Sequence, residues 1–188
     1  MPLVVNKNQI RNDIILALRK CLEEKPLMNI TMRDVAAKAN ISHSKILYYF
    51  HTKRELLRAY MEFTFESDSK VYEEFHADYL NGKIDVSSPR QYVKQFLQEV
   101  LTYLPNNLAL AQINILSYYD KDLLKSTAEV DMGPSDRINE VLSTLYGKDM
   151  HETAFSLLIL ICGIQFFSIN KEIPSDQVDR ILDCLADL

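Results

Sequence analysis

The segment from Thr31 to Lys53 restricts the fold of this chain more than any other part of the sequence. Thr31 begins a helical pattern of about nine residues, and Asp34 completes the Thr-x-x-acid pattern that caps the start of a helix. Asn40 marks the end of that helix, because asparagine adopts the left-handed backbone conformation at modest cost. Ser42 caps a second helix of about eight residues. Two helices this short bury too little apolar surface alone, so a third helix must complete their core.

Helical periodicity continues along the rest of the chain. An apolar stripe with one residue in every four predicts a first helix over residues 8–24; it consists of Ile10, Ile14, Leu18 and Leu22. Residues 53–79 contain neither glycine nor proline and predict one long helix. Caps and apolar stripes predict further helices over residues 88–104, 108–124, 134–146 and 149–170, and from residue 174 onward.

These patterns predict an all-α chain of about nine helices. Only 4 of the 188 residues are glycine, which argues against a turn-rich all-β fold. We expect a three-helix helix-turn-helix head, joined by the long helix to a larger helical body.

Charge is distributed unevenly between these two parts. Residues 1–58 contain 11 lysines and arginines against 5 acidic residues, whereas residues 59–188 contain 10 against 21. The first segment therefore carries a net charge of +6 and the second −11. A basic head on an acidic body is typical of a nucleic-acid-binding protein whose bulk faces away from the phosphates. The alternative is a chance clustering of solvated charges.

The second short helix, from Ser42 to Tyr49, is expected to fit the major groove of DNA. Apolar residues spaced four to five apart predict the buried side of this helix; they are Ile41, Ile46 and Phe50. Val35 of the preceding helix is expected to be buried with them. The outer side keeps hydrogen-bonding residues that suit base edges and phosphates, namely Ser42, His43, Lys45, Tyr48 and Tyr49. A solvated polar face on a small helical subdomain is the alternative.

Two flanking elements add candidate contacts. Lys53 begins the long helix, where the helix N-terminus and the lysine charge both favour a phosphate. Thr31 has the same opportunity at the start of its own helix. Arg33 lies one turn further on and can reach a guanine edge, unless it simply faces solvent.

The stretch from Ile30 to Leu57 closely resembles the DNA-binding head of the tetracycline-repressor (TetR) family. The resemblance covers about the first 58 residues in detail and beyond them only the helix count and chain length. It implies that phosphates are bound by Thr31, Tyr49 and Lys53, and that bases are read by Arg33, His43, Lys45 and Tyr48, with Ser42 at the start of the recognition helix.

Three positions depart from the family pattern. Asn40 and Ser44 stand where the family usually has glycine, and Leu47 replaces a common tyrosine. Ser44 can donate a hydrogen bond and is therefore added to the candidate DNA contacts. Leu47 loses a phosphate-bonding hydroxyl and offers an apolar side chain instead. The operator sequence therefore does not transfer from any relative.

The resemblance also implies a division into a DNA-binding domain, residues 1–52, and a ligand-binding and dimerisation domain, residues 53–188. The helix around residues 154–169 is apolar on most faces and must be covered on all of them. With the last helix it predicts a four-helix dimer interface that contains Leu157, Leu158, Ile161, Val178, Ile181 and Leu185. An ordinary intrachain core is the alternative.

A ligand pocket is the least specific expectation. Aromatic and amide side chains mix in the middle helices and suit a pocket with a few placed polar groups; the candidates are Tyr103, Gln112, Tyr118, Tyr119, Gln165 and Phe166. Each also suits the core or the surface. The three cysteines, Cys21, Cys162 and Cys184, lie in apolar helical patterns and are expected to be small buried hydrophobic residues.

The sequence and the resemblance together predict a cytoplasmic homodimeric repressor that binds a palindromic double-stranded DNA operator and is released by a small-molecule effector. The same head also fits an activator, or a regulator controlled by a protein partner. An interaction module without DNA binding would not need the basic head. We find no phosphate loop, nucleophile motif or metal-ligand spacing, so we expect no enzyme activity, cofactor, metal or membrane association.

Overall fold

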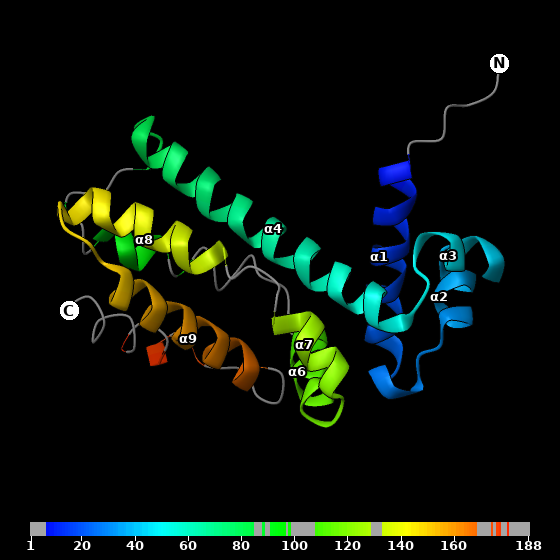
Figure 1. Ribbon diagram of the computed structural model, residues 1–188. Coiled ribbons are helices and arrows are strands. Elements are labelled where there is room, and N and C mark those ends of the chain that lie inside the picture. The colour runs from blue at the N-terminus through cyan, green and yellow to red at the C-terminus, as the bar shows by residue number, and fades with distance from the viewer. Residues whose placement is uncertain are drawn as a thin grey trace, which may run out of the picture. The chain divides into compact units, whose positions relative to one another are not determined.

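The computed structural model describes residues 7–84, 88, 91–96, 98, 108–128, 133–168, 174, 176–177 and 180. The regular structure of these residues is helical and contains no strand, which confirms the all-α prediction (Figure 1). The elements are α1 (Lys7–Glu24), the 3-10 helix η1 (Leu27–Asn29), α2 (Met32–Lys38), α3 (His43–Tyr49), α4 (Lys53–Leu80), α6 (Leu108–Tyr119), α7 (Lys121–Ala128), α8 (Gly133–Tyr146) and α9 (His151–Ser168). Residues 91–96 are helical as well.

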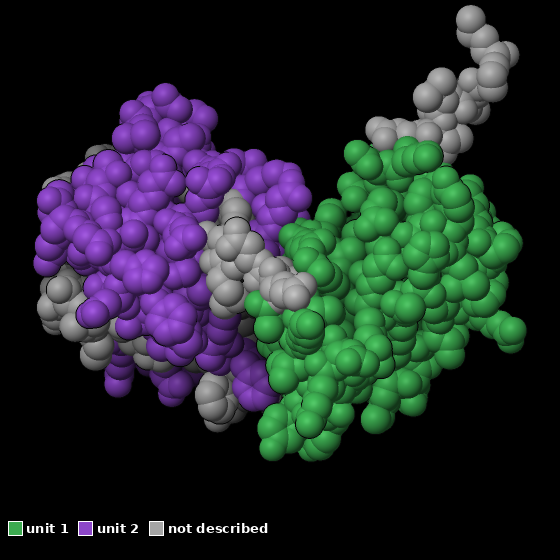
Figure 2. Space-filling model, in the orientation of Figure 1, with its two compact units in different colours: residues 1–64, 109–131 green, residues 65–108, 132–188 purple. Residues whose placement is uncertain are grey.

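The chain divides into two compact units (Figure 2). Unit 1 comprises residues 1–64 and 109–131, and unit 2 comprises residues 65–108 and 132–188. The N-terminal helices therefore share a unit with α6 and α7, although more than forty residues separate them from α6 in the sequence. Helix α4 contributes its first 12 residues, 53–64, to unit 1 and the rest to unit 2.

The helix-turn-helix forms as its capping residues predict. The Thr31 hydroxyl accepts from the Asp34 amide at 3.3 Å, and the Asp34 carboxylate accepts from the Thr31 amide at 2.7 Å, so α2 begins with a complete capping box. Asn40 has the expected left-handed backbone, with φ of 55°. The Ser42 hydroxyl accepts from the Lys45 amide at 3.1 Å and caps α3.

The core of the N-terminal helices is built from the predicted apolar stripe. Ile14 and Leu18 of α1 are fully buried, as are Ile46 of α3 and Phe50 directly after it. Helix α1 packs against α2, and α2 packs against α3. Ile41 is only half-buried, so its expected place in the core was wrong: it lies in the turn, where its amide donates to the Ala36 carbonyl at 2.9 Å.

The single helix predicted over residues 108–124 is in fact two helices. Helix α6 ends at Tyr119, and the Asp120 carboxylate then accepts from the amides of Asp122 and Leu123, at 3.1 and 3.0 Å. Asp120 therefore acts as an N-cap that starts α7. The apolar periodicity runs through this break, which is why the sequence pattern did not reveal it.

The core of unit 2 gathers around an aromatic cluster. Tyr92 is fully buried and lies edge-on to Phe75 and Tyr79 of α4, with ring centroids 5.2 and 4.6 Å away. Burial raises the pKa of the Tyr92 phenol, and its hydroxyl lies 3.2 Å from His76 Nδ1. Apolar residues of α8 and α9 complete this core, including Ile138, Leu142, Leu157, Leu158 and Ile161.

Helix α9 turns its predicted interface residues inward. Leu157, Leu158 and Ile161 are buried in the core of unit 2, while Phe155, Ile159 and Phe166 stay 50, 59 and 49% exposed. Cys162 is exposed, so its predicted burial was wrong, whereas Cys21 is buried as expected. A helix that is apolar all round does not reveal from sequence which face turns inward. Val178, Ile181, Cys184 and Leu185 lie outside the described residues.

Candidate nucleic-acid interface

The outer face of α3 is polar and exposed. Ile46 is buried on the inner side of the helix. The exposed residues are His43, Ser44, Lys45 and Tyr48. An α-helix with its side chains is about 10–12 Å in diameter, which matches the width of the major groove. The exposed side chains of α3 can all form hydrogen bonds, whereas the apolar Leu47 is half-buried.

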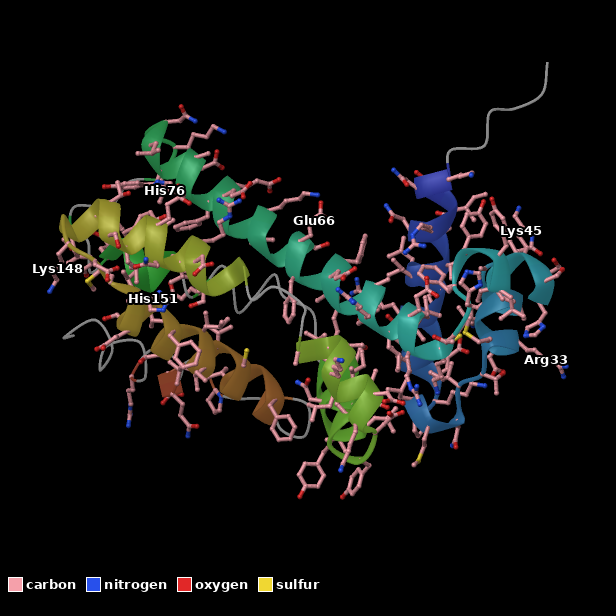
Figure 3. All side chains as sticks on the ribbon, viewed as in Figure 1. Arg33, Lys45, Glu66, His76, Lys148 and His151 are labelled. Atoms are coloured by element: carbon pink, nitrogen blue, oxygen red, sulfur yellow. The ribbon has the colours of Figure 1, made fainter. Side chains whose placement is uncertain are left out.

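Three donor side chains on this surface make no hydrogen bond or ion pair with any described residue. They are Arg33 of α2, and His43 and Lys45 of α3. Arg33 and Lys45 lie on the side of α2 and α3 away from α1 (Figure 3). Their donor groups are therefore open to water or to a bound partner.

The hydroxyl groups near these donors are already engaged. The Ser42 hydroxyl caps α3 and lies 3.0 Å from the Ser44 hydroxyl. The Thr31 hydroxyl donates to the Asp34 carboxylate at 2.6 Å in addition to capping α2. Lys25 forms an ion pair with Asp34 at 2.7 Å, and these bonds from Lys25 and Thr31 hold the pKa of Asp34 well below its usual range. These groups order the ends of the helices, and their oxygens keep lone pairs for a further partner.

Two tyrosines close the C-terminal end of α3. Tyr48 is exposed and Tyr49 half-buried, and their rings meet edge-on with centroids 5.1 Å apart. The Lys7 amine lies 6.0 Å from the Tyr48 ring centroid. Arg11 donates from Nη1 to the Tyr49 carbonyl at 2.9 Å. This contact could not be predicted from the sequence, because no spacing rule joins residues 38 positions apart.

Lys53 lies at the start of α4, as predicted, but its amine has a partner inside the protein. Nζ donates to the Leu27 carbonyl at 2.6 Å, and the side chain is half-buried. This desolvation lowers the pKa of the amine, although the charge of Asp34 acts in the opposite direction. A phosphate bound here would compete with the Leu27 carbonyl for the lysine.

Residues 14–60, which contain these helices, match the model of the bacterial regulatory proteins of the tetR family. The matched segment covers about a quarter of the chain. It runs from α1 into α4 and includes every predicted DNA contact.

Solved structures of TetR regulators share the fold of this chain over nearly its whole length. A TetR transcription regulator from Haloarcula marismortui is 18% identical with a TM-score of 0.73, covering 96% of this chain and 97% of the other. A TetR transcriptional regulator from Rhodococcus sp. RHA1 is 17% identical with a TM-score of 0.62, covering 97% and 96%. The multidrug binding protein EbrR, complexed with imidazole, is 19% identical with a TM-score of 0.62 and covers 93% of both chains. No curated protein sequence gives a significant match.

The predicted ligand residues have different surroundings. In unit 1, the Gln112 side-chain oxygen accepts from the Leu27 amide at 2.7 Å, whereas Tyr118 and Tyr119 are 80 and 79% exposed. Phe166, in unit 2, is half-exposed. Tyr103 and the side chain of Gln165 lie outside the described part of the chain. No helix in the described ranges is long and apolar enough to cross a membrane, and no cluster there has the ligands for a metal ion.

Proposed function

We propose that this chain is a cytoplasmic homodimeric repressor of the TetR family that binds a palindromic operator and releases it when a small molecule binds. The exposed polar face of α3, with donors that have no partner in the described chain, carries the proposal. Residues 1–52 bind DNA, and residues 53–188 bind the effector and the second subunit. The net charge of +6 over residues 1–58 supports attraction to the phosphates.

In the proposed complex, α3 enters the major groove. Arg33, His43, Lys45 and Tyr48 read base edges, because their side chains are exposed on α2 and α3 and can form hydrogen bonds. Thr31, Tyr49 and Lys53 bind phosphates, and the Ser42 and Ser44 hydroxyls add contacts at the N-terminus of α3. Lys53 exchanges the Leu27 carbonyl for a phosphate oxygen on binding.

The exposed face of α9 supports dimerisation. Phe155, Ile159, Cys162 and Phe166 follow one another at intervals of four, three and four residues, which is the spacing of a coiled-coil seam. We therefore place the contact with the second subunit on this face, while Leu157, Leu158 and Ile161 support it from inside. A two-fold dimer places its recognition helices about 34–36 Å apart, one turn of DNA.

A chain of hydrogen bonds within unit 1 supports control by a ligand. The side-chain oxygen of Gln112 in α6 accepts a hydrogen bond from the Leu27 amide at 2.7 Å. The Leu27 carbonyl accepts a second hydrogen bond from the Lys53 amine of α4 at 2.6 Å. Arg54 beside it pairs with Asp120 and Asp122, both at 3.1 Å. A movement of α6 and α7 on ligand binding would therefore act directly on the phosphate-binding end of α4. The fold shared with EbrR, a multidrug binding protein, supports a small-molecule effector.

Selection of bound duplexes from random double-stranded DNA tests the proposal. We expect the full chain to enrich an inverted repeat and to bind it as a dimer, with affinity that falls steeply as salt rises. A small-molecule panel screened for thermal stabilisation then yields effectors, which should weaken operator binding in a gel-shift titration. Failure to enrich any sequence at low salt would contradict DNA reading, and a ligand that leaves operator affinity unchanged would contradict the release mechanism.

A further inference from the structure

We propose that Arg11 of α1 is a positioning residue for DNA reading, which fixes the C-terminal end of the recognition helix α3 without touching DNA. The proposal rests on the proposed DNA-binding function and names a residue outside the predicted contact surface. It follows from the contacts of one guanidinium group with two consecutive residues at the end of α3.

The two contacts use different properties of the same group. Nη1 of Arg11 donates to the Tyr49 carbonyl at 2.9 Å. The central carbon of the guanidinium lies 4.3 Å from the centroid of the Phe50 ring, which is fully buried. Only a planar cation can donate in its plane while its face covers an aromatic ring. Together the contacts fix both the position and the orientation of the backbone where α3 ends.

The end of α3 needs such support because it lacks the usual helix terminators. The helix has seven residues and no basic residue in its last turn. Phe50 follows it in an extended conformation, with φ of −142° and ψ of 104°, so no left-handed residue satisfies the last carbonyls. Arg11 supplies a donor and a positive charge at this carbonyl end from another helix.

The two ends of α3 are therefore held independently. The Ser42 cap holds the N-terminal turn, which carries His43 and Lys45. Arg11 holds the C-terminal turn, which carries Tyr48 and Tyr49. Loss of Arg11 should loosen the two tyrosines and leave the N-terminal turn in place. The preference for particular base pairs should then weaken at the operator positions near Tyr48. It should persist at the operator positions near His43 and Lys45.

The test compares Arg11→Met with the wild-type full chain on a selected operator. We expect affinity to fall roughly tenfold, the value for one lost charge-assisted hydrogen bond. The slope of log affinity against log salt should stay unchanged, because no phosphate contact is lost. Reselection from random duplexes should show relaxed preference at one group of positions only. The operator affinity of Arg11→Lys should be close to that of Arg11→Met, since lysine keeps the charge but lacks the planar face.

Arg19→Gln is the matched control, since it removes from the same helix a cation whose one ion pair among the described residues is with Glu23 at 3.8 Å. It should bind and select DNA as the wild type does. If Arg11→Met reduces the slope of log affinity against log salt by about one and loses affinity equally for all sequences, Arg11 contacts a phosphate and the proposal is overturned. Wild-type affinity and selectivity in Arg11→Met would also overturn it.

Hydrogen exchange provides a readout that does not depend on DNA. The Phe50 amide donates to the Ile46 carbonyl at 2.9 Å, and we expect it to exchange faster in Arg11→Lys while the Lys45 amide keeps its protection. This measurement decides the role of Arg11 if Arg11→Met does not fold. If the wild type selects no DNA but the exchange pattern is as expected, the proposed function fails and the anchoring of α3 by Arg11 stands.

Discussion

At the scale of single residues, the candidate interface combines side chains with two different tasks. Lys45 is exposed and has no partner among the described residues, whereas Lys53 is half-buried and bound to a backbone carbonyl. A base reader acts on particular base pairs, and a phosphate contact acts on every sequence alike. The two lysines therefore provide a direct comparison of reading with positioning.

Lys45→Ala should relax the preference for particular base pairs by about 1–3 kcal/mol and leave other sequences nearly unaffected. Lys53→Ala should weaken binding to all duplexes alike and reduce the salt slope by about one, because one phosphate contact is lost. Fluorescence anisotropy with the selected operator and its single-base variants measures both effects. Equal losses on every sequence for both variants would contradict the assignment of Lys45 as a reader.

Asp34 links the start of α2 to the acid stability of the head. Its folded-state pKa is lowered by Lys25 and by the Thr31 hydrogen bonds. A lowered pKa means that the carboxylate stabilises the fold at pH values above its unfolded pKa, about 3.9, and that this contribution is lost as the pH falls toward the folded pKa.

The melting temperature of the wild type should therefore fall as the pH drops below about 4. Asp34→Asn should show a lower melting temperature at neutral pH and a shallower decline in acid, because it has no charge to lose. Thermal unfolding followed by circular dichroism from pH 3 to about 7 measures both curves. Parallel curves for the two proteins would show that Asp34 does not contribute to the acid sensitivity.

At the scale of helices, local capping signals predicted the fold wherever they coincided with the hydrophobic pattern. Residues 53–79 were predicted as one helix, and α4 is Lys53–Leu80. The turn at Asn40 was also predicted, because its conformation depends on that residue alone. The break at Asp120 was missed, since the apolar pattern continues across it and its cap depends on one aspartate.

The candidate site was predictable only in part, for a related reason. Exposure of Lys45 agrees with the helical period, because Lys45 does not share the face of Ile46, whereas His43 lies one turn before Ile46 and is exposed in the first turn of the helix. The contacts of Arg11 with Tyr49 and of Lys53 with Leu27 join residues 38 and 26 positions apart. Such contacts depend on how helices pack, and no pattern within one helix encodes them.

The link between α6 and α4 gives a prediction at this scale. Gln112→Leu removes the acceptor of the Leu27 amide and should lower the stability by about 1–3 kcal/mol, because a partly buried donor loses its partner. It should also change operator affinity, since the Leu27 carbonyl accepts a hydrogen bond from Lys53, the proposed phosphate contact. Gln112→Glu keeps an acceptor oxygen, so its stability and operator affinity should remain closer to those of the wild type. Denaturant unfolding and operator titration of both variants measure these effects, and unchanged operator affinity in Gln112→Leu would disprove the link.

At the scale of the whole molecule, the question is how two DNA-reading heads are brought together. One head offers a single short helix to the groove, and a palindrome is read only when two such helices lie one turn of DNA apart. In the proposed dimer, the contact between the bodies therefore sets the spacing of the heads. The exposed apolar face of α9, which includes Phe155 and Ile159, is our candidate for this contact.

Ile159→Glu places a charge in the middle of this face and should convert the dimer into monomers, since a buried carboxylate without a partner is costly. The monomer should stay helical, because Ile159 lies outside the buried core. Its affinity for the full palindrome should fall to that for a half-site, as the second head no longer binds the same molecule of DNA. Analytical ultracentrifugation and titration of full and half operators measure these outcomes.

Thr153→Glu introduces the same charge at a half-buried position of α9 outside the 155–159–162–166 seam and serves as the control, which should remain a dimer. If Ile159→Glu also remains a dimer that binds the palindrome with wild-type affinity, the second subunit binds elsewhere. The face formed by Phe155, Ile159 and Phe166 would then be available to an effector or another partner. If both variants become monomers, a negative charge anywhere on α9 disrupts assembly, and the seam is not the specific contact.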